Sequence, residues 1–112
     1  MAFNYPTPEE VKTNNPGILR QAAIDRAVQV AADEEANRLG EEIRAAMAPN
    51  SPPWKFPGEH LFGDDKDRIK YEARLEAMKR HQQELKRAGY CAKVEFSDAQ
   101  SSYVLIVNLK QG

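Results

Sequence analysis

The chain has 112 residues, a length that favours a single domain with one hydrophobic core. Its formal net charge is −1, so no overall positive charge would draw it to nucleic acid or to anionic lipid. One cysteine, Cys91, excludes an intramolecular disulfide and a zinc site made of several cysteines, and it favours a reducing compartment. The first residues do not read as a secretory signal, and no apolar run approaches the length of a membrane span. We therefore expect a cytoplasmic protein with no membrane partner.

Residues 1–16 are expected to form an N-terminal arm with a short helix. Thr7 suits the N-cap position, and Glu10 stands where the acidic partner of a capping box belongs. Pro16 follows two asparagines, so it interrupts this helix and suits the first turn of the next one.

A long helix is predicted over residues 17–48. Apolar residues recur there at steps of three and four, which is typical of one face of an amphipathic helix. They include Ile24, Val28, Leu39, Ile43 and Met47. The many alanines favour helix, whereas Gly40 costs about 1 kcal/mol relative to alanine in a helix interior. A cluster of prolines after residue 48 ends the helix.

Residues 49–63 are predicted to form a loop rich in proline and aromatic residues. It contains Trp54, Phe56 and Phe62, and large apolar side chains of this kind are scarce in disordered linkers. Two interpretations remain open for these side chains. They either fill the core between the helices or anchor the chain to a partner, as rigid aromatic residues often do.

A second helix is predicted over residues 64–88, followed by a β-hairpin over residues 90–110. Asp64 or Asp65 suits the N-cap of this helix, and Gly89 marks its end. The hairpin's return strand is apolar on both faces, so Val104 and Ile106 point away from a helix that covers the other face. Either another segment or a second copy must cover them, and we expect a homodimer or higher homo-oligomer.

Together these elements predict an α+β fold in which residues 1–112 form a single domain. Its architecture is two long antiparallel helices joined by the Pro/aromatic-rich loop, with a C-terminal β-hairpin and a short N-terminal helix.

The sequence offers no convincing catalytic or metal-binding group. His60 and His81 lack the spacing of metal ligands, and Cys91 has no base adjacent to it in the sequence. The glycines are scattered and form no phosphate-binding turn. We expect no enzyme activity, no metal and no cofactor.

The favoured hypothesis is a non-enzymatic interaction protein that binds and inhibits or organises another macromolecule. Small inhibitors of host or defence machinery encoded by phages or mobile elements have this size and character, and such a protein would act in the host cytoplasm. The partner-binding residues would be surplus apolar side chains of the loop and the hairpin. They are Trp54, Phe56, Phe62, Val104 and Ile106.

Two alternatives use the basic end of the second helix. In the first, a homo-oligomer sequesters a small anionic ligand such as a nucleotide, held by Arg80, Lys86, Arg87 and Tyr90. In the second, the same end of the helix binds nucleic acid. Charge does not favour the second alternative, since the first 63 residues are acidic overall, and no nucleic-acid-binding motif is present.

Overall fold

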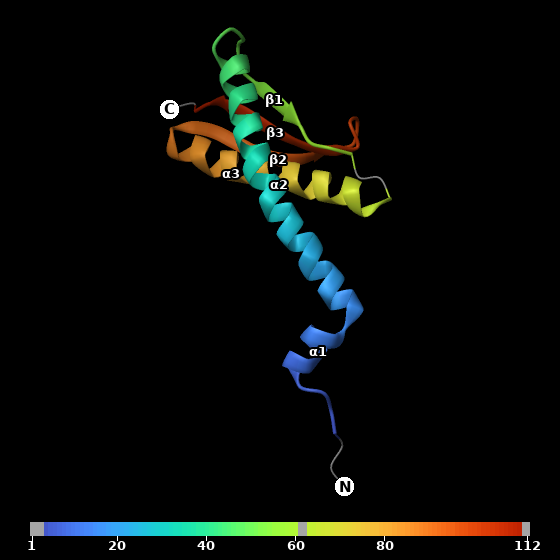
Figure 1. Ribbon diagram of the computed structural model, residues 1–112. Coiled ribbons are helices and arrows are strands. Elements are labelled where there is room, and N and C mark those ends of the chain that lie inside the picture. The colour runs from blue at the N-terminus through green and yellow to red at the C-terminus, as the bar shows by residue number, and fades with distance from the viewer. Residues whose placement is uncertain (1–3, 61–62, 111–112) are drawn as a thin grey trace.

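The computed structural model describes residues 4–60 and 63–110. In chain order its elements are α1 (Pro8–Asn14), α2 (Pro16–Met47), β1 (Trp54–Pro57), α3 (Asp65–Arg87), β2 (Tyr90–Ser97) and β3 (Ser102–Leu109). The predicted α+β fold is confirmed, with its long helix, shorter second helix, C-terminal hairpin and short N-terminal helix (Figure 1).

Local capping sets the ends of the helices. The side chains of Thr7, Asn15 and Asp64 each accept a hydrogen bond from a backbone N–H in the first turn of α1, α2 and α3, respectively. Gly89 follows α3 with a φ of 101°, a conformation that glycine adopts without steric cost. The chain can therefore reverse within two residues, and β2 begins directly beside the helix that precedes it.

The sheet is antiparallel, with strand order β1-β3-β2. The β2-β3 hairpin was predicted, but β1 was not, because it lies within the predicted loop over residues 49–63. Trp54 pairs with Val107 and Pro57 with Val104, and burial alternates along β1 as it does along a strand with one face on the core. β1 has only four residues, with prolines before and within it. Its alternation of buried and exposed side chains is therefore too short to be recognised from sequence.

The two longer helices lie on one side of the sheet and cross each other (Figure 1). Arg20, near the beginning of α2, pairs with Asp65, the first residue of α3, so the two helices begin on the same side of the point where they cross. The helices thus run in the same general direction, and the expected antiparallel arrangement is wrong. The reason is β1, which carries the chain back along the sheet before α3 begins.

The core lies between the sheet and the two longer helices. It consists of Leu39, Ile43, Trp54, Phe56, Ala77, Met78, Ala92, Leu105 and Val107. Trp54 is 7% exposed and Phe56 is 4% exposed, so these aromatic side chains fill the core, which was one of the two interpretations open from sequence. Burial of each contributes about 2–3 kcal/mol to stability.

Gly40 has a packing role in α2. A Cβ atom at this position would lie 3.2 Å from Cε1 of His81, whose Nε2 forms the hydrogen bond with Ala36 O. The absence of a side chain at position 40 lets the imidazole approach α2. This close approach gives a reason for a glycine at position 40, where glycine otherwise weakens the helix.

The molecule is elongated because α1 and the first turns of α2 project from the body as an arm (Figure 1). Its dimensions are 69 × 30 × 26 Å, and its radius of gyration is 18.8 Å. A compact domain of this length would have a radius of gyration of about 13 Å. Residues 16–23 are exposed, and α1 contains no buried residue. The arm therefore contributes little to the core.

Candidate binding site

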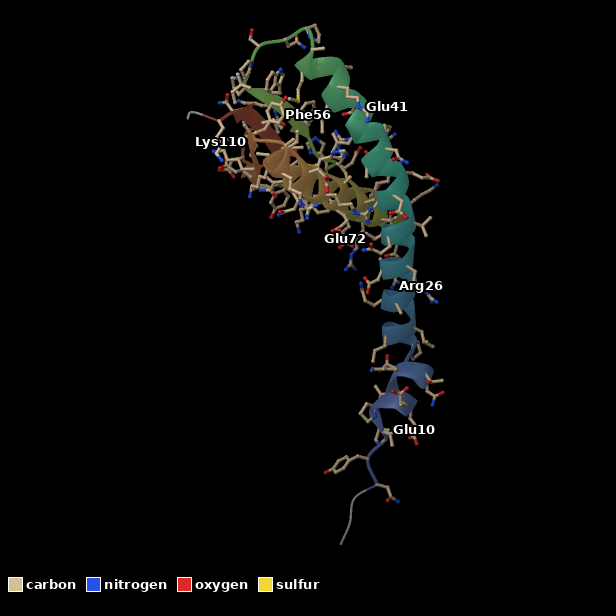
Figure 2. All side chains as sticks on the ribbon, turned by 90° about the vertical axis from the view of Figure 1, so that its left-hand side faces the viewer. Glu10, Arg26, Glu41, Phe56, Glu72 and Lys110 are labelled. Atoms are coloured by element: carbon tan, nitrogen blue, oxygen red, sulfur yellow. The ribbon has the colours of Figure 1, made fainter. Side chains whose placement is uncertain are left out.

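One face of the sheet packs on the helices, and the helices leave the other face open (Figure 2). Strand register assigns residues to this open face, because successive side chains of a strand point to opposite sides. Lys55, Ile106 and Lys93 form one row across β1, β3 and β2. The open face consists of Lys55, Pro57, Cys91, Lys93, Glu95, Ser97, Ser102, Val104, Ile106 and Asn108, of which Ser102 and Val104 are buried.

The structure separates the five residues that were expected to contact a partner. Trp54 and Phe56 belong to the core, and Val104 is only 4% exposed although it belongs to the open face. Their burial removes these three side chains as accessible contacts in this conformation. Ile106 is half-buried at the centre of the open face, whereas Phe62 lies outside the described residues. Of the five, Ile106 alone is placed at an accessible site.

A groove of about 990 Å³ lies where β2 begins and β3 ends. Its lining is Pro53, Lys86, Tyr90, Cys91, Ala92, Lys93, Ile106, Asn108, Leu109 and Lys110. This lining combines apolar side chains with three lysines and includes no carboxylate. Lys93 pairs with the neighbouring Glu95 at 3.0 Å, while Lys86 and Lys110 form no ion pair with any residue in 4–60 or 63–110. The groove therefore suits a ligand with an apolar part and a negative charge.

The basic patch expected at the end of the second helix is divided between two sides of α3. Lys86 and Tyr90 line the groove, but Arg80 and Arg87 line a separate hollow against α2. Arg80 donates to Asp33 at 2.7 Å, and this hydrogen bond raises the pKa of the Arg80 guanidinium. Arg87 donates to Glu84 at 2.8 Å. Within a single chain the four residues therefore do not share one pocket, and both arginines face acidic neighbours.

Sequence reasoning missed two lysines of the groove, Lys93 and Lys110. Lys93 reaches the groove through β2-β3 pairing, which places it opposite Ile106. Lys110 follows the last residue of β3, beside the start of β2. The period of two along the predicted strand indicates that Cys91 and Lys93 share a face. Only the strand register shows which residues of β3 lie beside them.

Arg74 joins three elements of the fold. Its side chain is 7% exposed and donates to Pro57 O at 3.0 Å, to Glu35 at 3.1 Å and to Glu42 at 2.9 Å. Glu35 also pairs with Arg38. A buried guanidinium needs hydrogen bonds to offset the loss of its hydration, and each of the three nitrogens of Arg74 donates one. The network fixes α3 against α2 and β1, so its role is structural.

The histidine of α3 and the single cysteine lie on different sides of the fold. His81 faces α2, whereas Cys91 lies on the open face of the sheet, so the two do not form a nucleophile–base pair. Among the residues that the structure describes, no cluster of three His, Cys, Asp or Glu side chains could hold a metal ion. None of the described helices is long and apolar enough to cross a lipid bilayer.

No protein-family model matches the chain, and the searches found no significantly similar curated protein or solved structure.

Proposed function

We propose that the chain is a non-enzymatic interaction protein that binds an acidic, partly apolar segment of another macromolecule in its groove and thereby inhibits or organises that partner. The observation that carries this proposal is the composition of the groove at the end of the sheet where β2 begins and β3 ends: apolar side chains and three lysines without a carboxylate.

The two parts of the lining have different physical roles. Ile106, Leu109 and Tyr90 provide apolar surface, whose removal from water is the main source of affinity. Lys86 and Lys110 are exposed cations, which steer an acidic partner and select against basic ones more than they add affinity. Binding should therefore weaken moderately with salt and fail when the charge of the groove is reversed.

The test is affinity capture with the full-length protein and a charge-reversed variant, Lys86→Glu/Lys110→Glu. Both substituted side chains are exposed, so the variant should fold, and circular dichroism checks that it does. Lys12→Glu, on the projecting α1, is the matched control because it changes an exposed lysine away from the groove. A partner that binds the wild type and the Lys12 variant but not the double variant supports the proposal. Equal capture by all three proteins excludes the groove as the binding site.

A small anionic ligand is the second candidate for the same groove. Its volume of about 990 Å³ lies at the upper end of the range found for ligand pockets, about 300–1,000 Å³. A nucleotide bound there would raise the melting temperature of the wild type but not that of Lys86→Glu/Lys110→Glu. At a ligand concentration of 100 times Kd, the stabilisation would be about 2.7 kcal/mol. No shift with any nucleotide at millimolar concentration would remove this candidate. Nucleic-acid binding has less support, because Arg80 and Arg87 already face carboxylates.

A further inference from the structure

The strand β2 is an unprotected edge of the sheet. Its eight residues pair with β3 in an uninterrupted register, and within the described residues no strand pairs with its other side. One side chain bonds to its backbone: Gln82 of α3 donates to Ala92 O at 3.3 Å. Edge strands are often protected by proline, a bulge, a covering segment or charged side chains. β2 has no proline and no bulge, and its two exposed charges, Lys93 and Glu95, are of opposite sign. Such an edge can pair with another strand.

The side chains of β2 are self-complementary about Val94. Lys93 and Glu95 flank it on the open face, with exposed fractions of 61% and 53% for their side chains. If two β2 strands pair antiparallel with Val94 opposite Val94, then Lys93 of each copy stands opposite Glu95 of the other. On the helix-facing side, the small Ala92 of each copy stands opposite Phe96, a large apolar residue that is 54% exposed in the single chain.

We propose that two copies of this chain pair through β2, antiparallel and centred on Val94, to form one continuous six-stranded sheet. The occupant of the free edge is a second copy because this register places opposite charges together twice and places an exposed aromatic residue beside a small one. The proposal does not rest on the groove or on its ligand.

The projecting arm lies on the side where the second copy would sit. In Figure 1 the arm extends beyond the β2 side of the sheet, away from β1. The arm carries the exposed apolar residues Ile18 and Leu19, which are 39% and 48% exposed. A second copy that continues the sheet past β2 therefore lies beside the arm. The pairing gives a reason for a helix that reaches well beyond its own core.

A charge exchange between two variants tests the register. Lys93→Glu places two acids opposite each other twice in its homodimer, and Glu95→Lys places two lysines opposite each other twice. Each homodimer should be about tenfold to a hundredfold weaker than the wild type. A mixture of the two variants restores both opposite-charge pairs. With one variant labelled with nitrogen-15 so that the masses differ, native mass spectrometry should show more heterodimer than the twofold excess over either homodimer that random pairing gives. Ion pairs within one chain cannot produce this result, because each variant has lost its own Lys93–Glu95 pair.

A disulfide gives an independent test of the same register. Cys91 is exposed and would stand opposite Ser97 of the second copy, at the Cα separation of about 4.5–5.5 Å found in antiparallel pairs. This separation suits a disulfide, whereas residues 91 and 97 of one strand are about 20 Å apart and cannot be joined. Ser97→Cys should therefore form a covalent dimer under mild oxidation, and the control Gln100→Cys, at an exposed position in the turn, should not.

Several outcomes would overturn the proposal. The first is a wild-type protein that stays monomeric in sedimentation analysis from micromolar to millimolar concentration. The second is a mixture of the charge variants in which the heterodimer is no more than twice as abundant as either homodimer. The third is equal cross-linking of the Ser97 and Gln100 variants, which would show random collision and no defined register.

Discussion

The loss of the Arg74 guanidinium should destabilise this protein more than the loss of any exposed ion pair. In Arg74→Ala, Pro57 O loses its donor, and Glu35 loses one of two guanidinium partners while its side chain is only 12% exposed. Glu42 is 44% exposed, so water can replace the bond that it loses. A buried acceptor without a partner costs about 1–3 kcal/mol, and a broken buried ion pair costs about 3–5 kcal/mol. Because these terms overlap, we expect a total loss of about 3–5 kcal/mol.

The assay is urea unfolding followed by circular dichroism, with the free energy of unfolding taken from the midpoint and the slope. Total stability of a domain of this kind is about 5–15 kcal/mol, so the expected loss is readily measured. Arg38→Ala is the matched control, because Arg38 also pairs with Glu35 but its side chain is 66% exposed. An exposed pair contributes about 0–1 kcal/mol.

Arg74→Lys separates charge from geometry. A lysine keeps the positive charge, but its compact ammonium group cannot reach three acceptors on three different elements, so most of the loss should remain. The reasoning fails if Arg74→Ala costs less than about 1 kcal/mol, or if it costs no more than Arg38→Ala. It also fails if lysine fully replaces arginine, since that would show that only the charge matters.

Three further predictions test the packing and the electrostatics. Trp54→Ala should lower the free energy of unfolding by about 3–5 kcal/mol in urea titrations, because Trp54 is buried and its Nε1 donates to Asn50 O at 3.0 Å; a change below about 1 kcal/mol would contradict its place in the core. Gly58→Ala should cost about 1–3 kcal/mol, because the new Cβ would lie 2.9 Å from Tyr103 O, whereas Gly63→Ala, with no atom within 4 Å, should change the same measurement by less than about 0.5 kcal/mol. Burial raises the pKa of Tyr71 above its ordinary value of 10.0, so its contribution to stability is complete below that pH and is lost as pH rises through the higher pKa of the folded state. Melting curves in alkaline buffers should therefore show a shallower loss of stability for Tyr71→Phe than for the wild type, and parallel losses would contradict this assignment.

The sequence predicts the elements that have strong local signals. The caps at Thr7 and Asp64 and the stop at Gly89 are local features, and each lies where it was expected. β1 has no such signal, because its four residues are shorter than the window in which alternation can be recognised. Since β1 determines how the chain returns between α2 and α3, missing it also gave the wrong relative direction of the helices.

The candidate site shows a similar division between local and long-range information. Lys86 and Tyr90 are four residues apart at the end of α3, so their proximity could be predicted from sequence. Their separation from Arg80 could not, because Arg80 is held on the other side of α3 by Asp33, a residue of α2. Nor could the addition of Lys93 and Lys110 be foreseen, because it depends on β2-β3 register.

The groove and the β2 edge share Lys93, and this overlap separates the two proposals by experiment. In the dimer, Lys93 would face Glu95 of the second copy, while in the single chain it pairs with its own Glu95. In either state its charge is compensated, so Lys86 and Lys110 supply the uncompensated charge of the groove. Lys93→Glu should therefore weaken the dimer strongly. It should weaken binding of an anionic ligand less than Lys86→Glu does, when the ligand is titrated at a protein concentration at which each variant is monomeric. The reverse order of effects on ligand binding would place Lys93 at the centre of the groove and would contradict the assignment of its charge to Glu95.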